Sequence, residues 1–128
     1  MSFPPPDAPL TSVIIDDSTD FLEAATQLLA DDGIDVVGFA AASDEVVDQI
    51  LALRPDVVLI DVYLGAESGL DLARRLVSRG DGWLPVVLIS SESGSELAEL
   101  LDVGGVIGFI SKTDLSGDAI RSLLAGAE

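Results

Sequence analysis

The sequence predicts an α/β domain in which helices cover both faces of a parallel sheet. Short apolar runs rich in Val and Ile alternate along the chain with longer segments whose apolar residues recur at helical spacing. Such runs, when Pro, Gly and acidic residues bound them, are typical of strands buried on both faces of a parallel sheet. Regular alternation of strands and helices at this spacing also implies right-handed crossovers. We therefore expect five successive strand–helix units in one domain.

Each expected strand is a short run dominated by β-branched or large aliphatic side chains. Turn-forming residues separate these runs from the helical segments, and Pro85 opens the fourth run. Residues 62–68 are expected to form a loop, and a glycine-rich turn precedes the last strand. The expected strands are residues 12–15, 35–41, 57–61, 86–90 and 109–111.

The helices that follow these strands carry their own start and stop signals. Asp20 and Glu23 are spaced as a capping pair for the first helix, whereas Ser43 and Ser116 are placed to cap the second and the last. Gly33 is expected to end the first helix, because glycine readily adopts the left-handed conformation found there. The expected helices begin near residues 20, 44, 70, 95 and 117.

Length and composition limit the domain organisation. The 128 residues are enough for one domain core, and a hydrophobic content of 48% allows that core to be buried. No apolar stretch approaches the roughly 20 residues of a membrane span, and the proline-rich N-terminal segment lacks the features of a signal peptide. We therefore expect a flexible leader at residues 1–10, one domain at residues 11–128, and a cytoplasmic protein without membrane contact.

The charge and the missing residue types exclude several kinds of site. The net charge is −17, from 23 acidic and 6 basic residues, so direct binding to nucleic acid is disfavoured because the phosphate backbone is repelled. The chain contains no cysteine and no histidine, which excludes disulfides, thiol catalysis and the commonest general base. Any site is expected to rely on carboxylates, hydroxyls and the single lysine, Lys112.

Four of the expected strands end on residues that carry chemistry. The first ends before Asp16 and Asp17, the third at Asp61, the fourth at Ser90 and the last before Lys112. Because the carboxyl ends of parallel strands open on one edge of a sheet, these side chains are expected to share one site. Three carboxylates at short range require a cation, and an all-oxygen set suits Mg²⁺, with Mn²⁺ as the alternative ion.

The same residues fit the transfer of a phosphoryl group to a carboxylate. Asp61 would be the nucleophile, the metal and Lys112 would stabilise the charged phosphoryl oxygens, and Ser90 would donate a hydrogen bond. A single acidic residue at a strand end is more often a helix cap or turn former than a ligand. The combination at four strand ends is what favours a functional site.

With these segments in place, the chain resembles the receiver domains of two-component response regulators. The resemblance covers residues 12 to about 125 and rests on four segments taken together. They are Val-Ile-Ile-Asp16-Asp17-Ser, Pro55-Asp-Val-Val-Leu-Ile-Asp61 with Gly69-Leu70 after it, Val-Val-Leu-Ile-Ser90-Ser91, and Gly108-Phe109-Ile-Ser-Lys112. The resemblance implies a flavodoxin-like, doubly wound five-stranded sheet of order 2-1-3-4-5 with five helices.

The resemblance also implies a role for each residue of the site. Asp61 would accept a phosphoryl group from a histidine kinase, a phosphotransfer protein or a small phosphodonor. Asp17 would bind Mg²⁺ directly and Asp16 mostly through water, and Asp61 with the backbone carbonyl of Tyr63 would complete the metal site. Lys112 would pair with the phosphoryl oxygens.

Further residues would report or tune the modification. Ser90 would move toward the phosphoryl group and Phe109 would turn inward behind it, which is a two-state change biased by a new dianion. Tyr63 and Glu92 flank the pocket at positions that tune phosphoryl lifetime in this family. The changed face would bind an output protein or an output domain outside this chain, and the protein would be a monomer or a phosphorylation-dependent homodimer. It would not be an enzyme beyond slow self-phosphorylation from small donors and slow self-dephosphorylation.

Two departures from the family's pattern leave a second interpretation open. Gly65 stands where the family often has proline, and Thr113 stands where a cis-proline often follows the lysine. A cis bond before a residue other than proline costs about 2.5–4 kcal/mol, so the Lys112–Thr113 peptide is expected to be trans or strained. The alternative function is that of a receiver-like module that binds partners without being phosphorylated.

Overall fold

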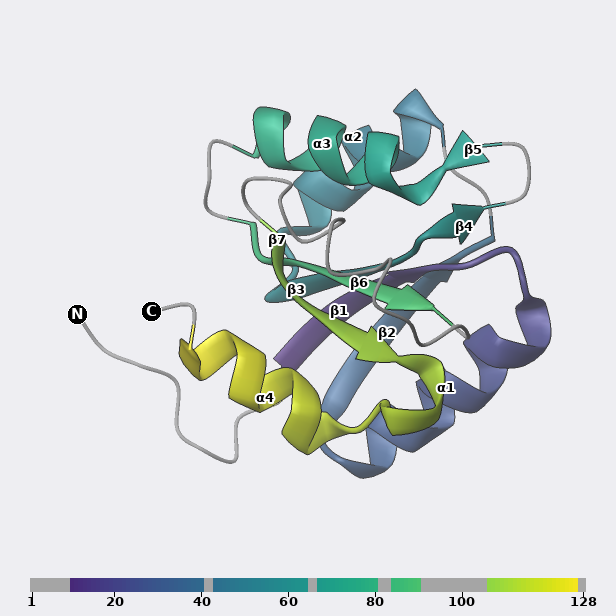
Figure 1. Ribbon diagram of the computed structural model, residues 1–128, viewed down its shortest axis with the longest axis vertical. Coiled ribbons are helices and arrows are strands. Elements are labelled where there is room, and N and C mark those ends of the chain that lie inside the picture. The colour runs from purple at the N-terminus through teal and green to yellow at the C-terminus, as the bar shows by residue number, and fades with distance from the viewer. Residues whose placement is uncertain (1–9, 41–42, 65–66, 81–83, 91–105, 127–128) are drawn as a thin grey trace.

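The molecule is built around one five-stranded parallel sheet (Figure 1). It is known from a computed structural model that describes residues 10–40, 43–64, 67–80, 84–90 and 106–126. The strands are β1 (Leu10–Ile15), β2 (Ile34–Phe39), β3 (Val57–Asp61), β6 (Val86–Ser90) and β7 (Val106–Ser111). Their order in the sheet is β2-β1-β3-β6-β7, which confirms the expected 2-1-3-4-5 arrangement and the flavodoxin-like class.

Helices cover both faces of this sheet. In Figure 1, α2 and α3 lie over one face, while α1 and α4 lie over the other. The described helices are α1 (Thr19–Asp31), α2 (Asp44–Leu53), α3 (Gly69–Arg79), the short 3-10 turn η2 (Lys112–Asp114) and α4 (Gly117–Gly126). None of the helices in these ranges is long and apolar enough to span a membrane. The helix expected near residues 95–102 lies outside the described residues, as do residues 1–9 of the expected leader.

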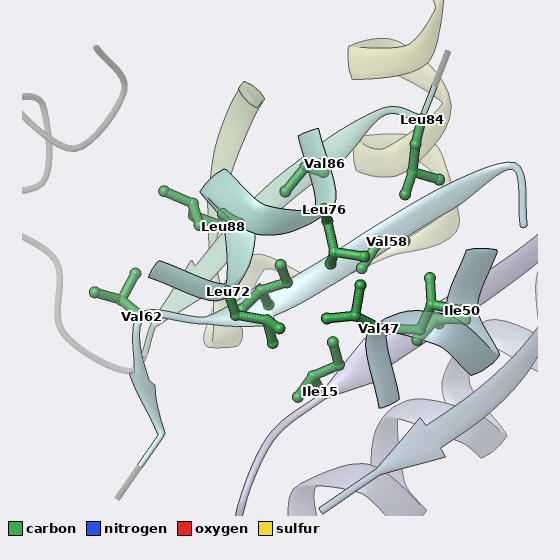
Figure 2. Packing of buried hydrophobic residues seen from close by; sticks show 13 residues of the cluster. Ile15, Val47, Ile50, Val58, Val62, Leu72, Leu76, Leu84, Val86 and Leu88 are labelled. Atoms are coloured by element: carbon green, nitrogen blue, oxygen red, sulfur yellow. The ribbon is translucent and has the colours of Figure 1, made fainter. Parts of the chain in front are cut away.

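Two apolar layers hold the helices on the sheet, because alternate residues of a strand point to opposite faces. Figure 2 shows the layer beneath α2 and α3, where strand residues such as Val58 and Leu88 meet Val47 and Leu76 of the helices. The other layer joins strand residues such as Leu59 to α1 and α4. All residues of β3 and β6 are buried, as expected for central strands of a doubly covered sheet.

Several expected boundaries were wrong by a few residues. β1 begins at residue 10 rather than 12, β2 covers residues 34–39 rather than 35–41, and β7 begins at residue 106 rather than 109. In each case backbone pairing extends or ends the strand where side-chain pattern alone gives no signal. Part of the expected loop at residues 62–68 is a small antiparallel hairpin of β4 (Tyr63–Leu64) and β5 (Glu67–Ser68). Strands of two residues are too short to show a hydrophobic period.

The helix caps agree with expectation at the second and last helices but not at the first. Ser43 Oγ accepts a hydrogen bond from the Val46 amide at 3.1 Å, and Ser116 Oγ accepts one from an amide of α4 at 3.0 Å. α1 is capped by Ser18, whose Oγ accepts a hydrogen bond from the Phe21 amide, rather than by the Asp20–Glu23 pair. Ser18 has the extended backbone of an N-cap residue, which places Asp20 inside the first turn.

The turn between α1 and β2 is tied to the start of α4. Gly33 has a φ of +82°, in the left-handed region that favours glycine. The preceding residue, Asp32, accepts a hydrogen bond from the Gly117 amide on Oδ2 at 2.8 Å, and its backbone carbonyl accepts one from the Arg121 guanidinium. Asp32 therefore satisfies an amide at the N-terminus of α4 from a distant part of the chain. This contact fixes the helix that follows β7 and η2.

Candidate functional site

The pairing of the strands brings four strand ends to one edge of the sheet. β1 and β3 are paired so that Asp16, which follows β1, lies level with Asp61 at the end of β3. β6 and β7 are paired so that Ser90 lies opposite Ser111, and Lys112 follows directly. This edge, which we call the carboxyl edge, is where open α/β sheets bind their ligands.

The three acidic residues at the carboxyl edge form one cluster. Each of Asp16, Asp17 and Asp61 offers a carboxylate oxygen, and these oxygens all lie within 4.8 Å of one another. Asp16 is fully buried and Asp61 is 5% exposed, whereas Asp17 is open to solvent. Asp16 is held by the start of α1, because its Oδ1 accepts a hydrogen bond from the Ser18 amide at 2.9 Å. The cluster therefore has a fixed, buried side and one accessible carboxylate.

Lys112 reaches this cluster from the end of β7, which is separated from β3 by β6 in the sheet. Its Nζ lies 2.6 Å from Asp16 Oδ2 and donates a hydrogen bond to Asp61 Oδ2 at 3.1 Å. The Lys112 side chain is 15% exposed, so the ammonium and the two carboxylates interact with little water between them. One positive charge is therefore shared by two buried negative charges.

The protonation of Lys112 reflects this environment. Burial of the ammonium acts to lower the pKa of Lys112, but hydrogen bonds to Asp16 and Asp61 and their Coulomb attraction outweigh it, so the pKa is raised above 10.5. Lys112 is thus fully charged at neutral pH. A permanently charged ammonium at this point suits the binding of anionic oxygens.

The donor set fits a hard divalent cation. It consists of carboxylate oxygens only, with no sulfur or imidazole nitrogen, which is the chemistry that Mg²⁺ prefers over softer transition metals. The single ammonium compensates for one of the three carboxylate charges, so the cluster retains an attraction for a further cation. Asp16, Asp17 and Asp61 would hold such an ion.

The backbone next to Asp61 is shaped by a glycine. The Gly69 amide donates a hydrogen bond to the Val62 carbonyl at 3.0 Å, which closes the segment containing the β4–β5 hairpin. A Cβ placed on Gly69 would lie only 1.9 Å from the Asp61 carbonyl oxygen. The start of α3 can therefore approach the end of β3 only because residue 69 has no side chain. The sequence pattern placed Gly69 in this segment but gave no reason for it.

The structure places the remaining expected residues as follows. Ser90 is fully buried at the end of β6. Phe109 is half-buried in β7 and packs against the apolar layer beneath α2 and α3. Tyr63 begins β4, two residues after Asp61, but its side chain lies outside the part of the chain that the structure describes, as do Gly65 and Glu92.

The peptide that follows the lysine is trans. The described residues contain no cis peptide bond, and Lys112 and Thr113 are among them. Lys112 reaches the acidic cluster with this trans bond, so threonine in place of the family's usual proline does not keep the ammonium from Asp16 and Asp61.

One aromatic residue at the site was missed. Phe21 was not among the expected site residues, yet Lys112 Nζ lies over its ring at 4.4 Å from the ring centre. Phe21 sits in the first turn of α1, four residues after Asp17, and this position already places it near the carboxyl edge. The contact itself depends on side-chain directions from two distant elements, which no sequence pattern provides.

Comparisons with known proteins agree with this fold and site. The family model described as the response regulator receiver domain matches residues 13–124. Among solved structures, a two-component response regulator of the LuxR family from Aurantimonas sp. SI85-9A1 superposes with a TM-score of 0.80 at 24% identity, covering 93% of this chain and 87% of the other. The signal receiver domain of a modulated diguanylate cyclase from Desulfovibrio desulfuricans G20 gives 0.74 at 26% identity, with 93% of both chains covered.

Curated relatives match the chain over part of their length only. Protein-glutamate methylesterase/protein-glutamine glutaminase 4 of Geobacter metallireducens is 38% identical over 87 residues, which cover 66% of this chain and 24% of the relative. The protein-glutamate methylesterase/protein-glutamine glutaminase of Alkalilimnicola ehrlichii is 34% identical over 112 residues, covering 84% of this chain and 28% of the relative. The chain thus spans less than a third of these two longer proteins.

Proposed function

The chain belongs to the response regulator receiver domain family, a family of phosphoacceptor signalling domains, and on this premise we propose that Asp61 is its phosphoacceptor. The observation that carries the proposal is the position of Lys112, whose ammonium bridges Asp16 and Asp61 at 2.6 and 3.1 Å. Phosphoryl transfer to a carboxylate needs a carboxylate nucleophile, a cationic group and ligands for a metal ion close together. The three carboxylates and Lys112 meet this requirement within one small volume.

In the proposed reaction, a carboxylate oxygen of Asp61 forms a bond to the phosphorus of the donor. The bond from phosphorus to the leaving atom breaks, and that atom keeps the electron pair, whether it is an imidazole nitrogen of a phosphohistidine or an oxygen of acetyl phosphate. Lys112 orients and neutralises the phosphoryl oxygens as they approach Asp61. Asp16, Asp17 and Asp61, with the Tyr63 carbonyl, would hold Mg²⁺ or Mn²⁺, which supplies further charge neutralisation when bound.

The readout of the modification is proposed to involve Ser90 and Phe109. Ser90 lies at the end of β6, on the same sheet edge as Asp61, and its hydroxyl is suited to donate a hydrogen bond to a phosphoryl oxygen. Phe109 is half-buried in the neighbouring strand, so a change in its packing would alter the surface of β7 and α4. Tyr63 and Glu92 are proposed to tune the lifetime of the phosphoryl group.

The wider role follows from the same premise. The donor is proposed to be a histidine kinase or phosphotransfer protein, and the changed face of β7 and α4 is proposed to bind an output protein or output domain. The chain would act as a monomer or as a phosphorylation-dependent homodimer, in the cytoplasm, without contact with nucleic acid. Residues 1–10 would be a leader and residues 11–128 the receiver domain. Its own chemistry would be limited to slow self-phosphorylation from small donors and slow self-dephosphorylation.

The test is the intact mass of the protein after incubation with acetyl phosphate and Mg²⁺. We expect one added phosphoryl group, which Asp61→Asn and an excess of EDTA both abolish. Asp35→Asn, at an exposed carboxylate on the edge strand β2, is the matched control and should be modified like the wild type. If the folded wild type gains no phosphoryl group from a donor that modifies another receiver, the alternative of a phosphorylation-independent binding module takes its place.

A further inference from the structure

The ammonium of Lys112 has three described contacts of two kinds. Two are the carboxylates of Asp16 and Asp61, and the third is the ring of Phe21, over which Nζ lies at 4.4 Å from the ring centre. A cation within about 6 Å of a ring centre is attracted by the negative face of the ring, and the attraction grows as water is excluded. The Lys112 side chain is only 15% exposed, so this contact is expected to be stronger than a cation–π contact at an exposed site.

A half-buried phenylalanine would ordinarily need no further explanation than packing. Phe21 does pack against the apolar layer beneath α1 and α4. That role would be filled by any large apolar side chain, and it does not require that the chain's single lysine lies over the ring face. The position of Nζ is therefore the observation that packing leaves unexplained.

The two carboxylate contacts are those that the proposed reaction would change. Phosphorylation converts the Asp61 carboxylate into an acyl phosphate, and Asp16 is among the residues that would hold the metal. The Phe21 ring carries no charge and takes no part in either event. It is thus the one of these three contacts that neither event would alter directly.

We propose that Phe21 is a positioning residue: it holds the Lys112 ammonium over its ring, so that the ammonium is already aligned when the phosphoryl group arrives. The inference rests on the proposed function of Asp61 for its kinetic consequence, but the contact itself does not. Loss of the ring leaves the ammonium more freedom and weakens its alignment with the transferred group. The expected result is slower phosphorylation from acetyl phosphate, a donor small enough to leave partner docking out of the measurement.

The contact can be observed directly because Lys112 is the chain's only lysine. With lysine labelled with ¹³C at Cε, one side-chain signal is expected, displaced upfield by the ring current of Phe21. Phe21→Leu should move this signal toward its ordinary position, whereas Phe21→Tyr, which keeps the ring, should leave it displaced. Phe39→Leu is the matched control, since Phe39 is also half-buried but packs against the opposite apolar layer. A signal unmoved in Phe21→Leu, or moved equally in Phe39→Leu, would overturn the proposal.

The rates of phosphorylation of the variants test whether Phe21 acts through Lys112. Phe21→Leu should slow phosphorylation by between about two- and thirty-fold, the range that a cation–π contact supports, and Phe21→Tyr should restore most of the rate. In a Lys112→Met background the same substitution should change the rate less than two-fold. An equal loss in both backgrounds would mean that Phe21 affects packing alone. If the Lys112→Met background is too slow to time, the Cε signal and the Phe21→Tyr rescue decide the proposal.

The two proposals fail in different ways. If the wild type accepts no phosphoryl group while the Cε signal responds to Phe21→Leu as expected, the role of Asp61 is wrong and the Phe21–Lys112 contact stands. If the wild type is phosphorylated and neither the signal nor the rate responds, Phe21 is a packing residue only.

Discussion

Replacing Gly69 by alanine is expected to disturb the end of the strand that carries Asp61. The new Cβ would lie 1.9 Å from the Asp61 carbonyl oxygen, 2.8 Å from the Asp61 carbonyl carbon and 3.0 Å from Val62 Cα. All three atoms belong to the backbone, so no side-chain rotation can relieve the overlap. The start of α3 and the end of β3 must separate by about 1 Å or more before an ordinary contact is restored.

Two opposing terms set the size of the effect. Overpacking that shifts the backbone costs about 1–3 kcal/mol. Alanine is preferred to glycine inside a helix by up to about 1 kcal/mol, but Gly69 is the first residue of α3, where less of this preference applies. We therefore expect the free energy of unfolding to fall by about 1–2 kcal/mol. A displacement of about 1 Å at a reacting group can slow a reaction by about a hundred-fold, so we expect phosphorylation of Asp61 to slow by about ten- to a hundred-fold.

Urea denaturation and the time course of phosphoryl uptake measure these two effects separately. Gly126→Ala is the matched control, because Gly126 lies in α4 with nothing within 4 Å of a Cβ placed on it. That variant should be as stable as the wild type or slightly more stable and should react at the wild-type rate. If Gly69→Ala behaves like Gly126→Ala in both assays, the close approach of α3 does not position Asp61, and the steric reasoning is refuted.

Three further expectations concern Lys112 and the helix that follows it. Lys112→Met leaves the buried carboxylates of Asp16 and Asp61 without their shared cation. Urea denaturation at neutral pH should therefore show that the free energy of unfolding falls by about 3 kcal/mol, the low end for a broken buried ion pair. An unchanged free energy of unfolding would mean that the ion pair makes no net contribution to stability. The pKa of Lys112 is raised in the folded state, so the stabilising effect of its charge is complete below pH 10.5 and is lost as the pH rises through the higher pKa of the folded state. The wild type should therefore lose stability more steeply above pH 10.5 than Lys112→Met. Asp32→Ala removes the acceptor of the Gly117 amide and should cost about 1 kcal/mol in the same denaturation assay, whereas Asp35→Ala should cost little.

The sequence could predict that the site residues lie close together, because their proximity depends on the topology of the sheet rather than on side-chain conformations. Residues that follow buried parallel strands come to one sheet edge whatever their conformations, so the positions of Asp16, Asp61, Ser90 and Lys112 in the chain were enough. The order of the strands came from the family resemblance and is confirmed by the observed pairing.

What could not be predicted depends on local competition or on distant side chains. Ser18 and Asp20 both carry oxygens suited to a helix cap, and the backbone conformation of Ser18 decides between them. The β4–β5 hairpin is held by pairing of two residues on each side, which leaves no periodic signal. The contact between Phe21 and Lys112 joins residues far apart in the sequence through side-chain directions that only the folded structure defines.

Charge balance at the carboxyl edge supports the role proposed for the Ser90 hydroxyl. Three carboxylates and the Lys112 ammonium leave two net negative charges, which a single divalent cation would neutralise. Phosphorylation of Asp61 replaces one carboxylate charge by a phosphoryl group that carries about −1.5 to −2. Up to one negative charge would then remain in a mostly buried site, where an unneutralised charge is costly. The chain's single lysine is already shared by Asp16 and Asp61, so we expect neutral hydrogen-bond donors to supply the additional stabilisation. Ser90, buried at the end of β6 on the same sheet edge as Asp61, is the hydroxyl that we propose for this role.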